Sequence, residues 1–166
     1  LLNVAVEGTR RADGVMNRRI GAKETMEAVK AHPHYEAPIE GKYRGRGVGM
    51  GFCRNNSGMA CAVANVLSDG TVSLVEGSVD IGGTRVAVAQ QLAEVLGIPV
   101  EDVNPQIADT DTIGYTSSTG GSGVAFKTGW AAYEAAHDVI RQLVQRAALT
   151  WEANEDQVDY TDGVLS

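Results

Sequence analysis

Two short turns rich in glycine and hydroxyl residues carry the strongest chemical signal in the chain. They read Gly82-Gly83-Thr84 and Thr119-Gly120-Gly121-Ser122, and an apolar helical pattern follows each of them. The start of a helix has unpaired backbone N–H groups and the positive end of the helix dipole, and glycine lets an anionic ligand approach the backbone. Two such turns in one small domain predict binding of an extended, polar and phosphorylated ligand.

Each turn also has an interpretation that involves no ligand. Gly82 and Gly83 could form a strand-to-helix turn that only requires a positive φ, and Thr84 could cap the helix that follows. Thr119 and Ser122 could belong to a helix N-cap with a flexible loop before it. The residues alone leave these alternatives open.

Glycines also occupy alternate positions from Gly45 to Gly51, which superficially resembles a nucleotide-binding loop. Their period is two and no helix follows, so the segment predicts a strand whose bare face lies beneath a close helix. Arg44 and Arg46 flank this segment, either as solvated charges or as ligands of a phosphate.

Carboxylates and histidines give weaker signals. Asp109 and Asp111 follow a predicted strand and could do acid–base chemistry or bind a hard cation, but Asx turns that pair the loop backbone are favoured. His32 and His34 flank one proline, with no third ligand for a metal in view. We therefore assign no catalytic residue and no metal ligand.

The hydrophobic pattern predicts the elements that position these residues. Helices are expected over 21–31, 84–96 and 122–149, strands over 45–52, 59–67, 71–77 and 102–108, and a hairpin over 158–164. The fold class is α+β, with an antiparallel β meander packed by two main helices. Residues 1–42 are expected to form an irregular segment and a short helix. Residues 43–166 are expected to form one compact α+β domain.

Each of the two main helices is expected to bury one apolar stripe. Gly97 and Pro99 end the first of them, and its expected stripe consists of Val88, Leu92, Val95 and Leu96. The expected stripe of the long helix consists of Ala125, Trp130, Tyr133, Ala136, Val139, Ile140, Leu143 and Ala147. Its alanines would allow a close approach to a neighbouring helix.

Composition limits the partners of the chain. Its 166 residues are 43% hydrophobic and carry a formal net charge of −7, which argues against a nucleic-acid surface. No apolar run reaches the roughly 18 residues of a membrane span, so no membrane partner is expected. Cys53 and Cys61 are too few for a disulfide framework and should behave as small buried residues, which favours a cytoplasmic location.

Several motifs, in a specific order, resemble those of a known family. They are Arg44 to Gly49, Asp69 to Val72, Val79 to Arg85, Ala93 to Pro99, Ala108 to Asp111 and Thr119 to Ser122. With these motifs the chain resembles the molybdopterin-binding large subunit of the xanthine dehydrogenase and aldehyde oxidase family, the molybdenum hydroxylases. The resemblance covers a middle portion of that subunit and implies that the fold is part of a molybdopterin-binding domain.

The resemblance implies that both glycine turns bind the cofactor. The family uses the segment corresponding to Thr119–Ser122 to hydrogen-bond the pterin or its phosphate, and the loop corresponding to Gly82–Thr84 approaches the molybdenum centre. Many relatives have Gly-Gln-Gly in the first turn, where this chain has no glutamine. Family members often have a basic residue after the serine of the second turn, where this chain has Gly123.

The resemblance also implies a reaction and partners. The family hydroxylates a carbon of an N-heterocycle or aldehyde with oxygen from water, holds molybdenum on molybdopterin (usually a dinucleotide in bacteria), and passes electrons to iron–sulfur and flavin domains or subunits. Its general base is a glutamate in a Gly-x-Gly-Glu setting, which this chain lacks, so the chain is expected to be inactive alone. Surface meant for the remainder of the large subunit would favour self-association. The alternative is a non-catalytic, stand-alone module of the same fold that binds another anion or a protein partner.

Overall fold

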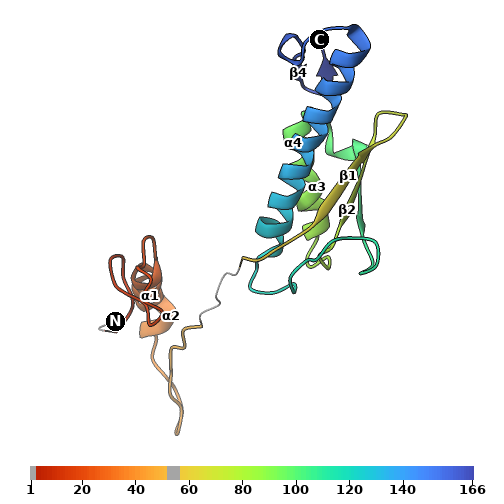
Figure 1. The fold of residues 1–166 in the computed structure, drawn as a ribbon. Helices are drawn as coiled ribbons and strands as arrows, with labels where there is room; N and C mark the ends of the chain where they lie inside the picture. The colour runs from red at the N-terminus through yellow and green to blue at the C-terminus, as the bar shows by residue number, and fades with distance from the viewer. Residues whose placement is uncertain (1–2, 52–56) are drawn as a thin grey trace. The chain divides into compact units, whose positions relative to one another are not determined.

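The computed structural model describes residues 3–51 and 57–166 of the chain (Figure 1). Its α-helices are α1 (Ala22–Ala31), α2 (Pro33–Glu36), α3 (Thr84–Leu96) and α4 (Val124–Trp151). Its strands are β1 (Ala62–Val66), β2 (Val72–Glu76), β3 (Val103–Ile107), β4 (Tyr160–Thr161) and β5 (Val164–Leu165), and two 3₁₀ helices are η1 (Val100–Asp102) and η2 (Glu155–Gln157). This mixture of helices and sheet confirms the α+β class.

The chain folds as two separate units, residues 1–51 and residues 52–166. In the first unit, α1 forms where the pattern predicted a helix, and His32 ends it with an extended backbone before Pro33. The boundary after residue 42 that we inferred from the sequence stays a prediction.

The glycine-rich segment of the first unit does not form the predicted strand. Gly45–Gly51 has no strand pairing, and Phe52, the last residue of that prediction, lies outside the described residues. Alternate glycines give the segment few side chains with which to pack against a partner. Arg46 instead reaches back and donates to the carbonyl oxygens of Tyr35 and Ala37 at 2.6 and 2.8 Å.

The second unit is built on a three-stranded sheet in the order β1-β2-β3. β1 and β2 pair antiparallel, and the turn between them contains Gly70 with a φ of 88°, as the Ser68-Asp69-Gly70 signal predicted. β3 pairs with β2 in parallel. Of the predicted meander of three antiparallel strands, only this hairpin forms, because residues 45–51 make no strand. The separately predicted strand over 102–108 forms β3, which is parallel to β2 because the chain crosses back through α3.

α3 and α4 pack against each other and against the sheet, α3 mainly over β3 and α4 over β1 (Figure 1). One apolar core lies between these layers. Its buried members are Val72, Leu74, Val88, Ala89, Leu92, Ala93, Leu96, Val103, Ala132, Ala136 and Val139. The glycine turns lie before the first residues of α3 and α4, so this core holds the two helix starts in place.

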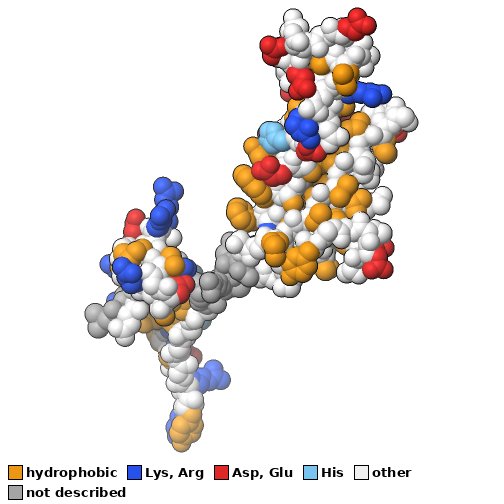
Figure 2. All heavy atoms as spheres, viewed as in Figure 1, with side chains coloured by type: hydrophobic (Ala, Val, Ile, Leu, Met, Phe, Trp, Pro, Cys, Tyr) orange, Lys and Arg blue, Asp and Glu red, His pale blue; other side chains and the backbone are white. Residues whose placement is uncertain are grey.

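Small residues bring α4 close to α3. A Cβ on Gly129 would lie 2.1 Å from Gln91 Oε1, and Ala132 is fully buried. Ala125, Trp130 and Tyr133, which we predicted inside, are exposed, Trp130 to 57% and Tyr133 to 37%. That prediction is wrong because the alanine side of α4 faces the core. Figure 2 shows apolar side chains exposed along this unit.

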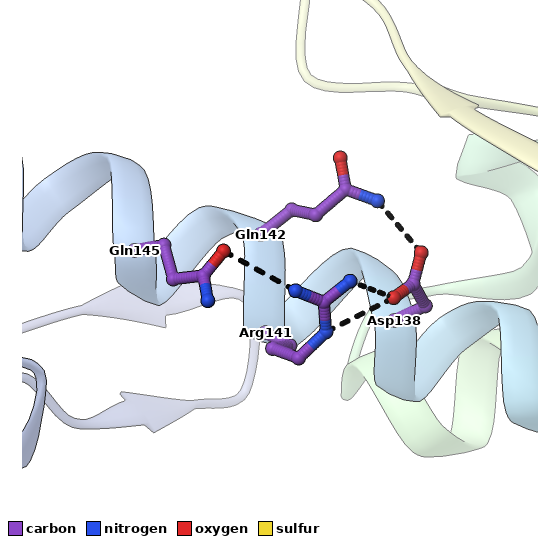
Figure 3. A network of polar contacts seen from close by, with 4 residues as sticks. All are labelled: Asp138, Arg141, Gln142 and Gln145. Carbon is purple, nitrogen blue, oxygen red and sulfur yellow. Dashed lines mark hydrogen bonds and ion pairs between the residues drawn. The ribbon is translucent and has the colours of Figure 1, made fainter.

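The exposed side of α4 carries a polar network (Figure 3). Arg141 donates to Asp138 and, at 3.2 Å, to Gln145 Oε1, while Gln142 Nε2 donates to Asp138 Oδ2 at 2.7 Å. Hydrogen bonds from Arg141 and then Gln142 lower the pKa of Asp138. Such pairs, three and four residues apart, support the helix locally. Within the described ranges, no helix has the length and apolar character needed to cross a membrane.

Candidate functional site

The first glycine turn connects the end of β2 to α3. Gly82 and Gly83 have φ values of 62° and 83°, in the left-handed region that favours glycine. A Cβ built on either residue meets no described atom within 4 Å. The backbone conformation therefore requires glycine here, and the turn leaves open space in front of α3.

A carboxylate of the chain itself caps the beginning of α3. Asp80 Oδ1 accepts the backbone N–H of Arg85 at 3.1 Å and the Thr84 hydroxyl at 3.5 Å, and Asp80 Oδ2 lies 3.8 Å from Arg85 Nε. Thr84 Oγ1 also accepts the N–H of Ile81 at 3.1 Å. The Thr84 hydroxyl therefore stabilises the turn, and a negative charge already lies at the positive end of the α3 dipole.

The second glycine turn precedes α4 and contacts the segment that leads into the first. Thr119 Oγ1 accepts the N–H of Val79 at 3.2 Å. Gly121 and Ser122 have successive φ values of 60° and 53°, and a positive φ is uncommon for serine. The Gly123 N–H then donates to the Gly120 carbonyl oxygen at 3.3 Å. The turn is thus tightly folded and attached to the chain that enters α3.

Both turns contribute to the walls of one pocket of about 290 Å³. Its lining residues are Ile81, Thr84, Thr119, Gly120, Ser122, Gly123, Val124 and Ala125. Four of the seven binding residues predicted from the sequence thus line one cavity, whereas Gly82, Gly83 and Gly121 do not. A Cβ on Gly120 would meet no described atom within 4 Å. The pocket can accommodate one portion of a large cofactor, since complete small-molecule sites span about 300 to 1,000 Å³.

Sequence reasoning missed Lys127, a buried cation behind the second turn. Its side chain is 6% exposed, and its Nζ donates to the Ser117 carbonyl oxygen, Ser117 Oγ and the Ser118 carbonyl oxygen at 2.8, 2.9 and 2.8 Å. None of the ion pairs among the described residues involves Lys127. The sequence did contain a signal that Lys127 is buried: it lies three residues after Val124, and that spacing places both on one face of the helix.

Glu76 is a second missed residue, at the end of β2. It is 1% exposed, and its Oε2 atom has no hydrogen-bond partner among the described residues. Burial, followed by the negative charge of Asp80, raises the pKa of Glu76 from 4.5 to about 7, against an opposing effect of Arg85. Strand alternation with buried Val72 and Leu74 was the signal that this carboxyl points into the protein.

The remaining candidates have local structural partners. Asp109 Oδ1 accepts the N–H of Asp111 at 3.0 Å, in the Asx turn that the sequence favoured. His32 Nδ1 accepts the N–H of His34 at 3.2 Å. Within residues 3–51 and 57–166, no three His, Cys, Asp or Glu side chains gather as a metal site would require. Cys61 is half-buried with a free thiol, and Cys53 lies outside the described residues.

Known proteins share this arrangement of helices and turns. Residues 21–166 match the family described as a molybdopterin cofactor-binding domain. The chain belongs to this family. The resemblance inferred from the order of the motifs is thereby confirmed, and both glycine turns fall within the matched residues.

The relatives are much longer than this chain. Xanthine dehydrogenase of Emericella nidulans is 29% identical over 126 residues, which cover 72% of this chain and 9% of that protein. The nicotine 6-hydroxylase large subunit of Paenarthrobacter nicotinovorans is 30% identical over 163 residues, or 86% of this chain and 20% of that protein. CO dehydrogenase from Oligotropha carboxidovorans has a solved structure that superposes with a TM-score of 0.56 at 28% identity, over 61% of this chain and 13% of that one. This molybdopterin-binding domain therefore spans a fifth or less of these relatives.

Proposed function

We propose that the pocket between the two glycine turns holds one portion of molybdopterin in an oxidoreductase of the molybdenum hydroxylase type. One observation carries this proposal: Thr84 from the first turn and Thr119, Gly120 and Ser122 from the second line one cavity in a molybdopterin-binding domain. Molybdenum on the bound cofactor would supply the oxidation chemistry, while residues of this chain bind and orient the cofactor.

The second turn fits the anionic or hydrogen-bonding edge of such a cofactor. Gly120 leaves its backbone open to a ligand, and Ser122 lines the same pocket. At the start of α3 the Asp80 carboxylate already accepts the Arg85 N–H and pairs with the Arg85 side chain, so fewer free donors remain there for an anion. We therefore place the phosphate-bearing portion at Thr119–Ser122. Gly82, Gly83 and Thr84 would border the other side of the cofactor.

The wider assembly is part of the same proposal. The cofactor would be the dinucleotide form, the substrate an N-heterocycle or aldehyde hydroxylated with oxygen from water, and the location the cytoplasm. The remainder of the large subunit would supply the general base, and iron–sulfur and flavin domains or subunits would accept electrons. Phe126 and Trp130, 64% and 57% exposed beside a groove of about 600 Å³ between α3 and α4, support contact with such partners or self-association.

Replacement of Gly120 tests the assignment directly. Gly120→Val adds a side chain in the pocket without a positive φ to strain the backbone. We expect at least a tenfold loss of bound pterin and molybdenum when the chain is purified from a host that makes the cofactor. Elemental mass spectrometry and the fluorescence of oxidised pterin measure both.

Gly45→Val is the matched control, because a Cβ at Gly45 also meets no described atom within 4 Å and Gly45 does not line this pocket. Equal pterin content in Gly120→Val and the wild-type chain would refute the second turn as a cofactor site. A wild-type chain without pterin or molybdenum would favour the alternative, a non-catalytic module that binds another anion or a protein.

A further inference from the structure

Lys127 places a positive charge behind the second glycine turn, against Ser117 and Ser118, at a position that no sequence motif indicated. We propose that Lys127 is the positioning residue of the second glycine turn, and that its charge makes the pocket selective for phosphate or diphosphate groups. The selectivity rests on the proposed function, whereas the positioning of the turn does not require a bound ligand.

The positioning argument begins with Ser117 and Ser118, which directly precede the turn. Lys127 Nζ directs three hydrogen bonds, all of 2.9 Å or less, at these two residues. On its other side, Ser117 is attached to Met59, because its N–H and Oγ both donate to the Met59 carbonyl oxygen at 2.9 Å. Lys127 thus connects α4 to the chain that enters the turn, and this chain in turn lies against the segment before β1.

A further hydrogen bond attaches the turn to the segment that precedes α3. Thr119 Oγ1 accepts the N–H of Val79 at 3.2 Å. Without Lys127, this long hydrogen bond and the attachment of Ser117 to Met59 would hold the approach to Gly120 and Ser122 less firmly. The Lys127 contacts, two and one residues before Thr119, restrain that approach and allow the strained φ of 53° at Ser122 to persist.

The charge argument depends on what surrounds the ammonium group. A buried charge must be compensated, and here three neutral oxygens take the place of water. No carboxylate pairs with Lys127 among the described residues, so its positive charge is not cancelled locally. An unpaired charge in a region of low dielectric acts strongly on nearby groups, which favours an anion at the second turn.

Amide hydrogen exchange of the 166-residue chain tests the positioning. The reporters are the N–H groups of Ser117 and Val79, which donate to the Met59 carbonyl and Thr119 Oγ1. We expect both amides to exchange at least tenfold faster in Lys127→Met, while the amide of buried Leu92 in α3 changes by less than twofold. Lys30→Met removes an exposed lysine from α1 and should leave all three rates unchanged.

Lys127→Met could lower the stability of the whole unit and so speed exchange at Leu92 as well. Lys127→Arg is a second variant that tests the positioning role if this happens. Arginine keeps the charge but cannot place three donors on the same two residues in the same way. In this variant we expect at least threefold faster exchange at Val79 with Leu92 unchanged. Wild-type exchange at Val79 and Ser117 in either folded variant would overturn the proposal.

Inorganic pyrophosphate then probes the charge. Titration followed at the Gly120 and Ser122 amides should give at least tenfold weaker binding in Lys127→Met than in the wild-type chain, with partial recovery in Lys127→Arg. Equal affinity in all three would overturn the charge role and leave the proposed function intact. A wild-type chain that binds no pyrophosphate would contradict the anionic pocket itself, and the exchange rates would then decide the positioning role alone.

Discussion

Glu76→Gln should stabilise the protein above neutral pH and leave it almost unchanged in acid. The carboxyl is buried with one unpartnered oxygen among the described residues, and its pKa rises from 4.5 to about 7 on folding. Between these values the folded chain binds more protons than the unfolded chain, so the free energy of unfolding falls as pH rises. One pKa unit corresponds to about 1.4 kcal/mol, so the raised pKa lowers the free energy of unfolding by about 1 kcal/mol at pH 5 and about 3 kcal/mol at pH 8. The glutamine amide has the same shape and cannot ionise.

Urea unfolding, followed by the helical circular dichroism signal, measures this effect. The free energy of unfolding of Glu76→Gln minus that of the wild-type chain should increase by about 2 kcal/mol from pH 5 to pH 8. Glu134→Gln removes an exposed carboxylate from α4 and controls for the change in net charge. A difference between Glu76→Gln and wild type that stays constant over this pH range would refute the reasoning.

Two further pairs of substitutions test the packing of the second unit. Leu92→Ala removes a fully buried side chain and should cost about 2 to 5 kcal/mol in urea unfolding, whereas Leu149→Ala, at a position 77% exposed, should cost less than about 0.5 kcal/mol. Similar costs for both leucines would contradict the core assignment. Gly97→Ala should lower stability by more than about 2 kcal/mol, because Gly97 has a φ of 64° and a Cβ there would lie 2.6 Å from Asp162 Cα. Gly70→Ala, with a φ of 88° and open space, should cost only about 1 kcal/mol, and an equal loss in both glycine variants would exclude the Asp162 contact as the cause.

Local signals predicted the elements that flank the first turn. α3 runs from Thr84 to Leu96, as the pattern predicted, because glycines in left-handed conformation lie at both of its ends, Gly83 before it and Gly97 after it. The predicted C-terminal hairpin is also confirmed: β4 and β5 pair across Asp162 and Gly163, which both have positive φ. In each case the deciding chemistry lies within a few residues of the element itself.

Pairing and burial required information from distant parts of the chain. The parallel pairing of β3 with β2 depends on how the helix between them crosses the sheet, and strand spacing does not encode that path. Which face of α4 is exposed also depends on a distant part of the chain, namely α3. Trp130 is more hydrophobic than Ala132, yet the close approach of α3 at Gly129 leaves room only for small side chains.

The sequence predicted the backbone turns of the candidate site but not the charged side chains beside them. Glycine and hydroxyl spacing indicated two helix starts, but the charges beside them come from Asp80 and Lys127, whose positions depend on tertiary contacts. Asp80 caps the start of α3 and pairs with Arg85, whereas Lys127, which no described carboxylate pairs, places a positive charge behind the start of α4. Under the proposed function, this difference between the two turns favours a single orientation of a ligand that is anionic at one end. We therefore expect Asp80 and Lys127, together with the glycines, to set the direction in which the proposed cofactor would lie.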